Sequence, residues 1–167
     1  TARLPWLLIG MIGGIGNSMI LGNFDSTFAA HPEMALYIPL IGGTGGNVGT
    51  QSSAIVVQGL ANSSLDAKNT FKQVTKEAVV ALINATIISL LVYTYNFIRF
   101  GATATVTYSV SISLFAVVMF ASIFGTLVPM TLEKLKIDPA IATGPFIAIT
   151  NDIIGMMLYM GITVLLS

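Results

Sequence analysis

The sequence predicts an all-α membrane protein with five transmembrane helices per chain, and composition is the first observation behind this prediction. Of the 167 residues, 54% are hydrophobic and 8% are charged, whereas a soluble domain carries about 25% charged residues. Seven basic residues balance seven acidic ones, so no net charge attracts a nucleic acid. The chain has no cysteine and one histidine, which excludes thiolate metal sites and histidine clusters.

The second observation is a series of apolar stretches, each long enough to cross a hydrocarbon core of about 30 Å. Together they predict a single transmembrane domain over residues 1–167, with no separate soluble domain. The expected spans are residues 4–24, 34–61, 71–98, 104–132 and 139–166. A cleaved signal peptide is the alternative for the first stretch, but its apolar run is too long for that interpretation.

Lysine and arginine give the third observation, because they concentrate on the cytoplasmic side of membrane proteins. With the N-terminus in the cytoplasm, every basic residue except Arg99 falls on that side. Lys68, Lys72 and Lys76 repeat every four residues and therefore share one helix face. We expect this face to meet anionic lipid headgroups, or alternatively to dock a cytoplasmic regulator.

The last span contains the one acidic residue expected near the bilayer centre. Asp138 and Pro139 match the N-cap and first position of a helix, and Asp152 follows about 20 Å further along that helix. No Lys, Arg or His is expected at the same depth. An Asp there costs roughly 2.5–3.5 kcal/mol, so we interpret Asp152 and the adjacent Asn151 as cation ligands. The alternative is a protonated Asp152 that forms an interhelical hydrogen bond.

Small and helix-breaking residues surround this acid. Gly144 precedes Pro145, which removes a backbone donor and frees a carbonyl group. Free carbonyl oxygens are ligands for hard cations or for water. Ala148 and Gly155 lie on the Asp152 side of the helix, where they leave room for an ion or, equally, allow a neighbouring helix to pack closely.

The second span carries a glycine-rich segment, residues 42–51, with the sequence GGTGGNVGTQ. So many glycines weaken a helix, and inside a membrane such a run persists only where protein or water satisfies the backbone. One interpretation is close helix packing, because the glycines recur with small-xxx-small spacing. The other is a pore wall, for which the expected residues are Gly45, Gly46, Asn47, Gly49 and Gln51.

These segments resemble the MgtE family. The stretch from Pro39 to Gln51, with its GGNVGTQ core, resembles the family's second membrane helix, and the opening RLPW of residues 3–6 resembles the start of its first helix. The DPAIATGP segment at residues 138–145 and the NDIIG segment at residues 151–155 resemble its last helix. The resemblance covers essentially the whole chain, in order and spacing.

The resemblance implies a Mg²⁺-transporting homodimer in which the second and fifth helices of each subunit line a pore at the dimer interface. The family's pore aspartate matches Asp152, and a pore-facing backbone carbonyl one turn earlier matches Ala148. Bacterial members also have cytoplasmic domains that sense Mg²⁺. Because this chain begins at Thr1, almost at its first apolar stretch, we expect no such regulatory domain within it.

We therefore expect a Mg²⁺ channel, with the transported ion as its ligand and no enzymatic activity. The expected metal ligands are Asp152, Ala148, Asn47 and Asn151, and the expected pore-lining residues are Gly45, Gly46, Gly49, Gln51, Gly144 and Gly155. The expected partners are a second copy of the chain, membrane lipid and divalent cations, in a bacterial or archaeal plasma membrane. Two alternatives stay open: a secondary transporter exchanging the cation for Na⁺ or H⁺, and a non-conducting subunit whose glycines only pack.

Overall fold

The computed structural model describes residues 3–142 and 144–167, and these residues form helices joined by short loops. The elements in chain order are α1 (Leu4–Gly22), α2 (Asp25–Ala30), the 3₁₀ turn η1 (Pro32–Tyr37), α3 (Ile38–Ala61), η2 (Ala67–Asn69), α4 (Thr70–Phe100), α5 (Thr105–Lys134), η3 (Pro139–Ala142) and α6 (Pro145–Leu166). No strand occurs among the described residues. The prediction of an all-α chain is confirmed for this part of the protein.

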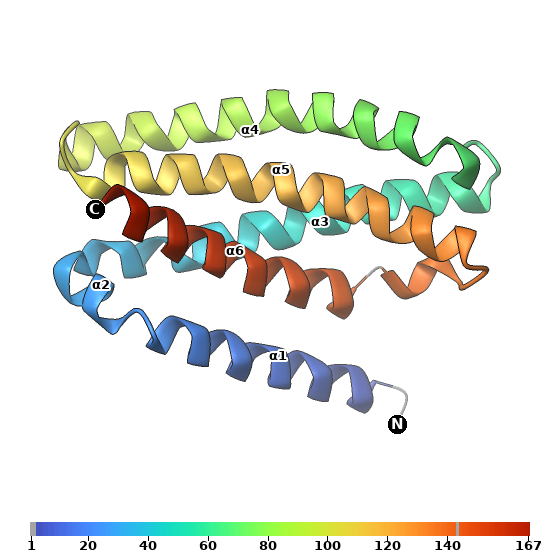
Figure 1. The fold of residues 1–167 in the computed structure, drawn as a ribbon, viewed down its shortest axis with the longest axis horizontal. Coiled ribbons are helices and arrows are strands. Elements are labelled where there is room, and N and C mark those ends of the chain that lie inside the picture. Colours follow the sequence, from blue (N-terminus) through green and yellow to red (C-terminus); the bar gives the residue numbers. More distant parts are fainter. Residues whose placement is uncertain (1–2, 143) are drawn as a thin grey trace.

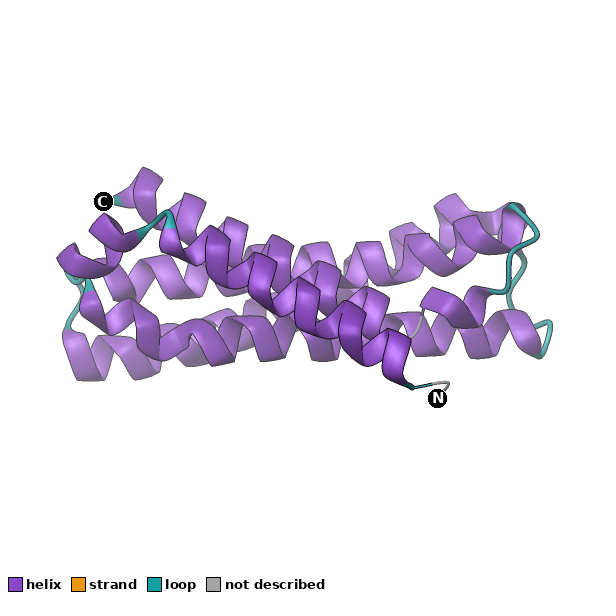
Figure 2. Ribbon diagram, turned by 90° about the horizontal axis from the view of Figure 1, so that it is seen from below, coloured by secondary structure: helices purple, strands orange, loops and turns teal. Residues whose placement is uncertain are grey.

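The long helices of the described residues, α1, α3, α4, α5 and α6, run side by side along one axis of an elongated bundle (Figures 1 and 2). α5 is the central helix, since it packs against α3, α4 and α6. α1 lies at the edge of the bundle and packs mainly against α6 (Figure 1). The first described turn of α1 and the last turn of α6 lie toward opposite ends of the bundle in both views.

Helix boundaries follow the apolar stretches closely, with one correction. We expected the last span to be a continuous helix from Pro139, but the structure has only a short 3₁₀ turn there, and α6 begins at Pro145. Gly144 precedes α6 with φ of +94°, a conformation that glycine adopts without the steric cost of a side chain. Both Pro139 and Pro145 suit the first position of a helix, and in the structure α6 begins at Pro145.

Tyrosine hydroxyls join the elements at the end of the bundle that contains η1. The Tyr159 hydroxyl on α6 donates a hydrogen bond to the backbone oxygen of Met34, at 2.8 Å. The Tyr37 hydroxyl donates to Oδ1 of Asn96 on α4. All four residues are buried, so these bonds are shielded from water and hold η1 between α4 and α6.

Four helical stretches of the described chain are long and apolar enough to cross a membrane: α1, α4 together with η2, α5 and α6. α3 has 24 residues, which is sufficient length, but it does not reach the same apolar threshold. The glycine, threonine, asparagine and glutamine residues of the 42–51 segment account for its lower hydropathy. A fifth crossing by α3 therefore stays a prediction.

Candidate ion site

Asp152 is the eighth residue of α6 and is partly buried in the bundle. Asp152 therefore lies about 10 Å along the helix axis from Pro145, where α6 begins, at 1.5 Å per residue. The non-helical backbone at residue 144 lies at the N-terminal end of the same helix. A carboxylate two turns beyond a helix break is an arrangement found where ions meet membrane helices.

The glycines of α3 face this carboxylate. A Cβ atom added to Gly42 would lie 3.5 Å from Oδ1 of Asp152, and one added to Gly46 would lie 3.8 Å from the same oxygen. Residues four apart share one face of a helix, so the two glycines form a strip of bare backbone beside the acid. Because no side chain fills this strip, the carboxylate oxygen lies against α3 without a polar side chain between them.

Asp152 has no cationic partner in the described part of the chain. The ion pair recorded there joins His31 and Glu33 at 3.9 Å, in the loop between α1 and α3. No group of three or more His, Asp or Glu side chains among the described residues could hold a metal ion. Within the described residues, one chain therefore brings a single carboxylate to this place, and a complete charge match for a divalent cation requires a second one.

Asn151, the neighbour of Asp152, points to a different side of α6. A Cβ atom on Gly49 of α3 would lie 1.9 Å from Nδ2 of Asn151, so the amide is packed directly against α3 backbone. Asn151 is 1% exposed, and both polar atoms of its side chain lack a hydrogen-bond partner. An unpaired buried amide costs about 1–3 kcal/mol. This orphaned group is consistent with a role toward water or an ion, and its assignment as a ligand stays a prediction.

The structure does not gather the other predicted site residues around Asp152. Asn47 and Gln51 are exposed on α3, away from the buried face that carries Gly45 and Gly49. Gly45 lies against α5, where an added Cβ would be 2.8 Å from Val117 Cγ1.

The two small residues of α6 also differ in their surroundings. Gly155 is buried, and a Cβ there would meet Val117 and Ile41 at 3.8–3.9 Å. Ala148 is partly buried one turn before Asp152. The roles of the exposed α3 residues, of Gly144 and of these two residues in a pore wall stay predictions.

Sequence reasoning missed one residue near the acid. Asn17 of α1 lines the same small cavity as Asp152. The sequence did contain a signal for it, because an asparagine within an apolar membrane span is energetically unfavourable and often has a functional role.

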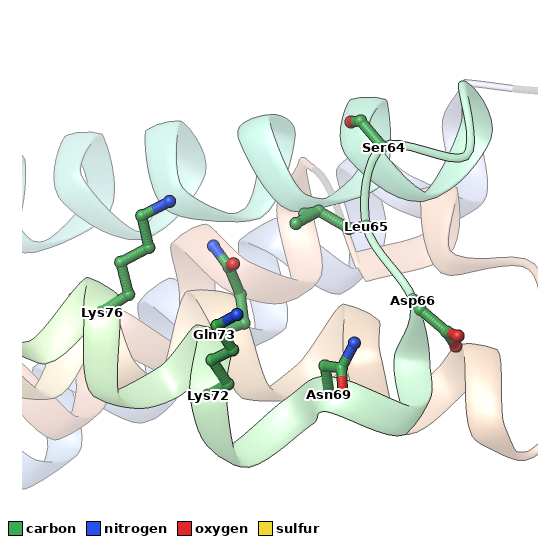
Figure 3. A pocket seen from close by; sticks show the side chains of 7 residues that line it. All are labelled: Ser64, Leu65, Asp66, Asn69, Lys72, Gln73 and Lys76. Atoms are coloured by element: carbon green, nitrogen blue, oxygen red, sulfur yellow. The ribbon is translucent and has the colours of Figure 1, made fainter.

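A second hollow lies at the other end of α3, where the loop after α3 meets the first turns of α4. Its volume is about 210 Å³, and its lining residues are Ser64, Leu65, Asp66, Asn69, Lys72, Gln73 and Lys76. Figure 3 shows the side chains of Lys72, Gln73 and Lys76 extending from α4 to the side on which Ser64 and Leu65 lie. Lys72 and Lys76, two of the three lysines expected on one helix face, therefore line this polar hollow, which does not include Asp152.

The fold and the site together are typical of one class of protein, the multi-span membrane proteins that bind or transport cations. The long apolar helices and the unpaired carboxylate beside glycine backbone are the features that indicate it. Comparison with known proteins makes this specific. Residues 38–162 match the MgtE family, described as divalent cation transporters. The chain belongs to the MgtE family, so it is an integral membrane protein, and the resemblance found in its motifs is confirmed.

Three curated relatives carry the name magnesium transporter MgtE. The chain is 33% identical to the protein of Bacillus subtilis over 160 residues, and 32% identical to that of Thermus thermophilus over 165 residues. It is 29% identical to the protein of Enterococcus faecalis over 160 residues. These alignments cover 96–99% of this chain but 35–36% of the relatives, so the chain spans about a third of their length. The family consists of transporters, which confirms the expectation of a non-enzymatic protein.

Proposed function

We propose that this chain forms a Mg²⁺-conducting pathway in which two copies contribute one Asp152 carboxylate each to a common axis. The observation that carries the proposal is the unpaired Asp152 carboxylate beside Gly42 and Gly46. The names of the curated relatives support Mg²⁺ as the ion. Two carboxylates match the charge of one divalent cation, and Mg²⁺ is held by one or two carboxylates while it keeps several waters.

In this proposal the chain crosses the membrane five times from a cytoplasmic N-terminus, and α3 is the least apolar of the crossings. A polar, glycine-rich helix at membrane depth needs water or protein around its backbone. A pore wall formed by α3 and α6 of both copies would supply that water. The exposed side chains of Asn47 and Gln51 would then contact the hydrated ion through water.

The site suits conduction because it binds weakly enough to release the ion. Mg²⁺ dehydrates reluctantly, so a pair of carboxylates that contacts retained waters avoids the full cost of dehydration. Favourable binding that still permits exit is the requirement for conduction. A helix broken near an acidic residue also occurs in coupled transporters, so the exchange of Mg²⁺ for Na⁺ or H⁺ is the second candidate.

Uptake into liposomes distinguishes these two functions. We expect liposomes containing the purified chain to take up Mg²⁺ when only a Mg²⁺ gradient is present, as reported by an enclosed Mg²⁺-sensitive dye. Adding a Na⁺ gradient or a pH gradient of either direction should leave the initial rate unchanged at a clamped membrane potential. Protein-free liposomes provide the background. Uptake that occurs only with a second ion gradient would establish the exchanger and reject the channel.

A further inference from the structure

A small cavity lies between α1 and α6, on the side of Asp152 that faces α1. Its volume is about 60 Å³, and its lining residues are Gly10, Gly13, Gly14, Asn17, Ile149 and Asp152. By this measure a water molecule needs about 10–15 Å³, so the cavity has room for a few waters. Asp152 therefore has two different surroundings, the glycine backbone of α3 on one side and this cavity on the other.

The polar groups of the cavity wall are the side chains of Asn17 and Asp152. Oδ1 of Asn17 is buried and has no hydrogen-bond partner among the described residues. A buried amide oxygen without a partner costs about 1–3 kcal/mol, and such atoms are therefore usually bonded to protein or to ordered water. The rest of the wall is Ile149 and helical glycine backbone, whose amide groups are engaged within their helices.

A donor placed between the two oxygen acceptors that share this cavity would satisfy both of them. The Asp152 carboxylate, when ionised, only accepts hydrogen bonds, and Oδ1 of Asn17 also only accepts. A water molecule has two donors and satisfies both oxygens at once, at little cost in immobilisation. The glycines leave space for it, since a Cβ on Gly10 or Gly14 would meet no heavy atom within 4 Å.

We propose that Asn17 is a positioning residue for Asp152, holding water in this cavity that fixes the carboxylate in the orientation in which it meets the ion. This inference rests on the proposed function, because the orientation of the carboxylate affects transport only if Asp152 binds the ion. It adds α1, a helix outside the pore wall formed by α3 and α6, to the elements that determine ion affinity. Partners of this kind, which orient a ligand without touching the ion, commonly change affinity by 10-fold or more.

Asn17→Leu tests the proposal because leucine has a similar size but offers no acceptor to water. We expect the half-saturating Mg²⁺ concentration for uptake to rise roughly tenfold, with a maximal rate within about twofold of wild type. Asn17→Ser, which keeps an oxygen and leaves space for a further water, should stay close to wild type. The matched control is Ser18→Ala, because the Ser18 hydroxyl bonds to Gly14 of its own helix and does not line the cavity.

An infrared measurement tests the same contact without transport. The carboxyl band of Asp152 is isolated as the difference between each protein and its Asp152→Asn counterpart. We expect this band to shift in Asn17→Leu and to stay in place in Ser18→Ala. An unshifted band in Asn17→Leu would overturn the proposal, as would a lower maximal rate with an unchanged half-saturating concentration. Absence of Mg²⁺ uptake by the wild-type chain would reject the proposed function alone, and the infrared comparison would still decide the role of Asn17.

Discussion

Replacing the Asp152 carboxylate by an amide should strongly reduce Mg²⁺ uptake while leaving the fold intact. In Asp152→Asn the side chain keeps its size but loses its charge, so the ion or its waters lose a charge-assisted contact worth about 1.5–3 kcal/mol per site. Since each 1.4 kcal/mol corresponds to a factor of ten, and both copies change together, we expect the initial uptake rate to fall by at least about tenfold. The dye-based liposome assay measures this directly.

The stability of the same variant separates a transport role from a structural one. Asp152 has no cationic partner in the described chain, and a charge at membrane depth is unfavourable by roughly 2.5–3.5 kcal/mol. Removing the charge should therefore leave the thermal unfolding temperature in detergent unchanged or raise it. If Asp152→Asn instead unfolded at a lower temperature and the loss of folded protein explained the lost uptake, Asp152 would have a structural role in the bundle. Unchanged uptake would support the interpretation of the glycines as packing positions only.

Adding one methyl group to Gly49 should cause the largest loss of stability among the glycine-to-alanine substitutions in α3. The new Cβ would lie 1.9 Å from Nδ2 of Asn151 and 3.1 Å from Cγ2 of Ile147, and both neighbours are at most 1% exposed. Gly49 is also packed closely against α5, since a Cβ built at Gly125 would lie 2.7 Å from the Gly49 backbone oxygen. Overpacking of this kind costs about 1–3 kcal/mol.

Gly43→Ala is the matched control on the same helix. A Cβ there would meet no heavy atom within 4 Å, and alanine is favoured over glycine in a helix by about 1 kcal/mol. We therefore expect opposite signs for the two variants in unfolding experiments in mixed micelles, with Gly49→Ala destabilised and Gly43→Ala unchanged or stabilised. Combining Gly49→Ala with Asn151→Ala should recover part of the loss, because the second change removes the clashing amide. Equal stability of the two single variants would contradict the close approach of α3 and α6.

The helices were predictable because apolar stretches between charged loops mark their positions, and α4 and α5 begin and end within two residues of the expected limits. The start of α6 was not. Both Pro139 and Pro145 suit a first helical position, and the local sequence does not decide between them. In the structure η3 packs against α5 and α3, and these tertiary contacts are not visible in the local sequence.

The candidate site was predictable in its components and not in its contacts. A lone acid in an apolar span identified Asp152, and the glycine run identified α3. Which face of α3 meets α6 depends on helix register, and the structure places Gly42 and Gly46 beside the carboxylate while Asn47 and Gln51 are exposed. The contribution of Asn17 was hidden for the same reason, since pairing α1 with α6 requires knowledge of tertiary packing.

Thiol labelling tests directly whether Asp152 lies on the water-filled path of the ion. The natural chain contains no cysteine, so Asp152→Cys introduces a single reactive thiol. The control is Leu91→Cys on α4, where the leucine is 67% exposed on an apolar face. A cationic, water-soluble thiol reagent should label position 152 at least about tenfold faster than position 91, because thiolates form in water and not in lipid. Equal, slow labelling at both positions would contradict the claim.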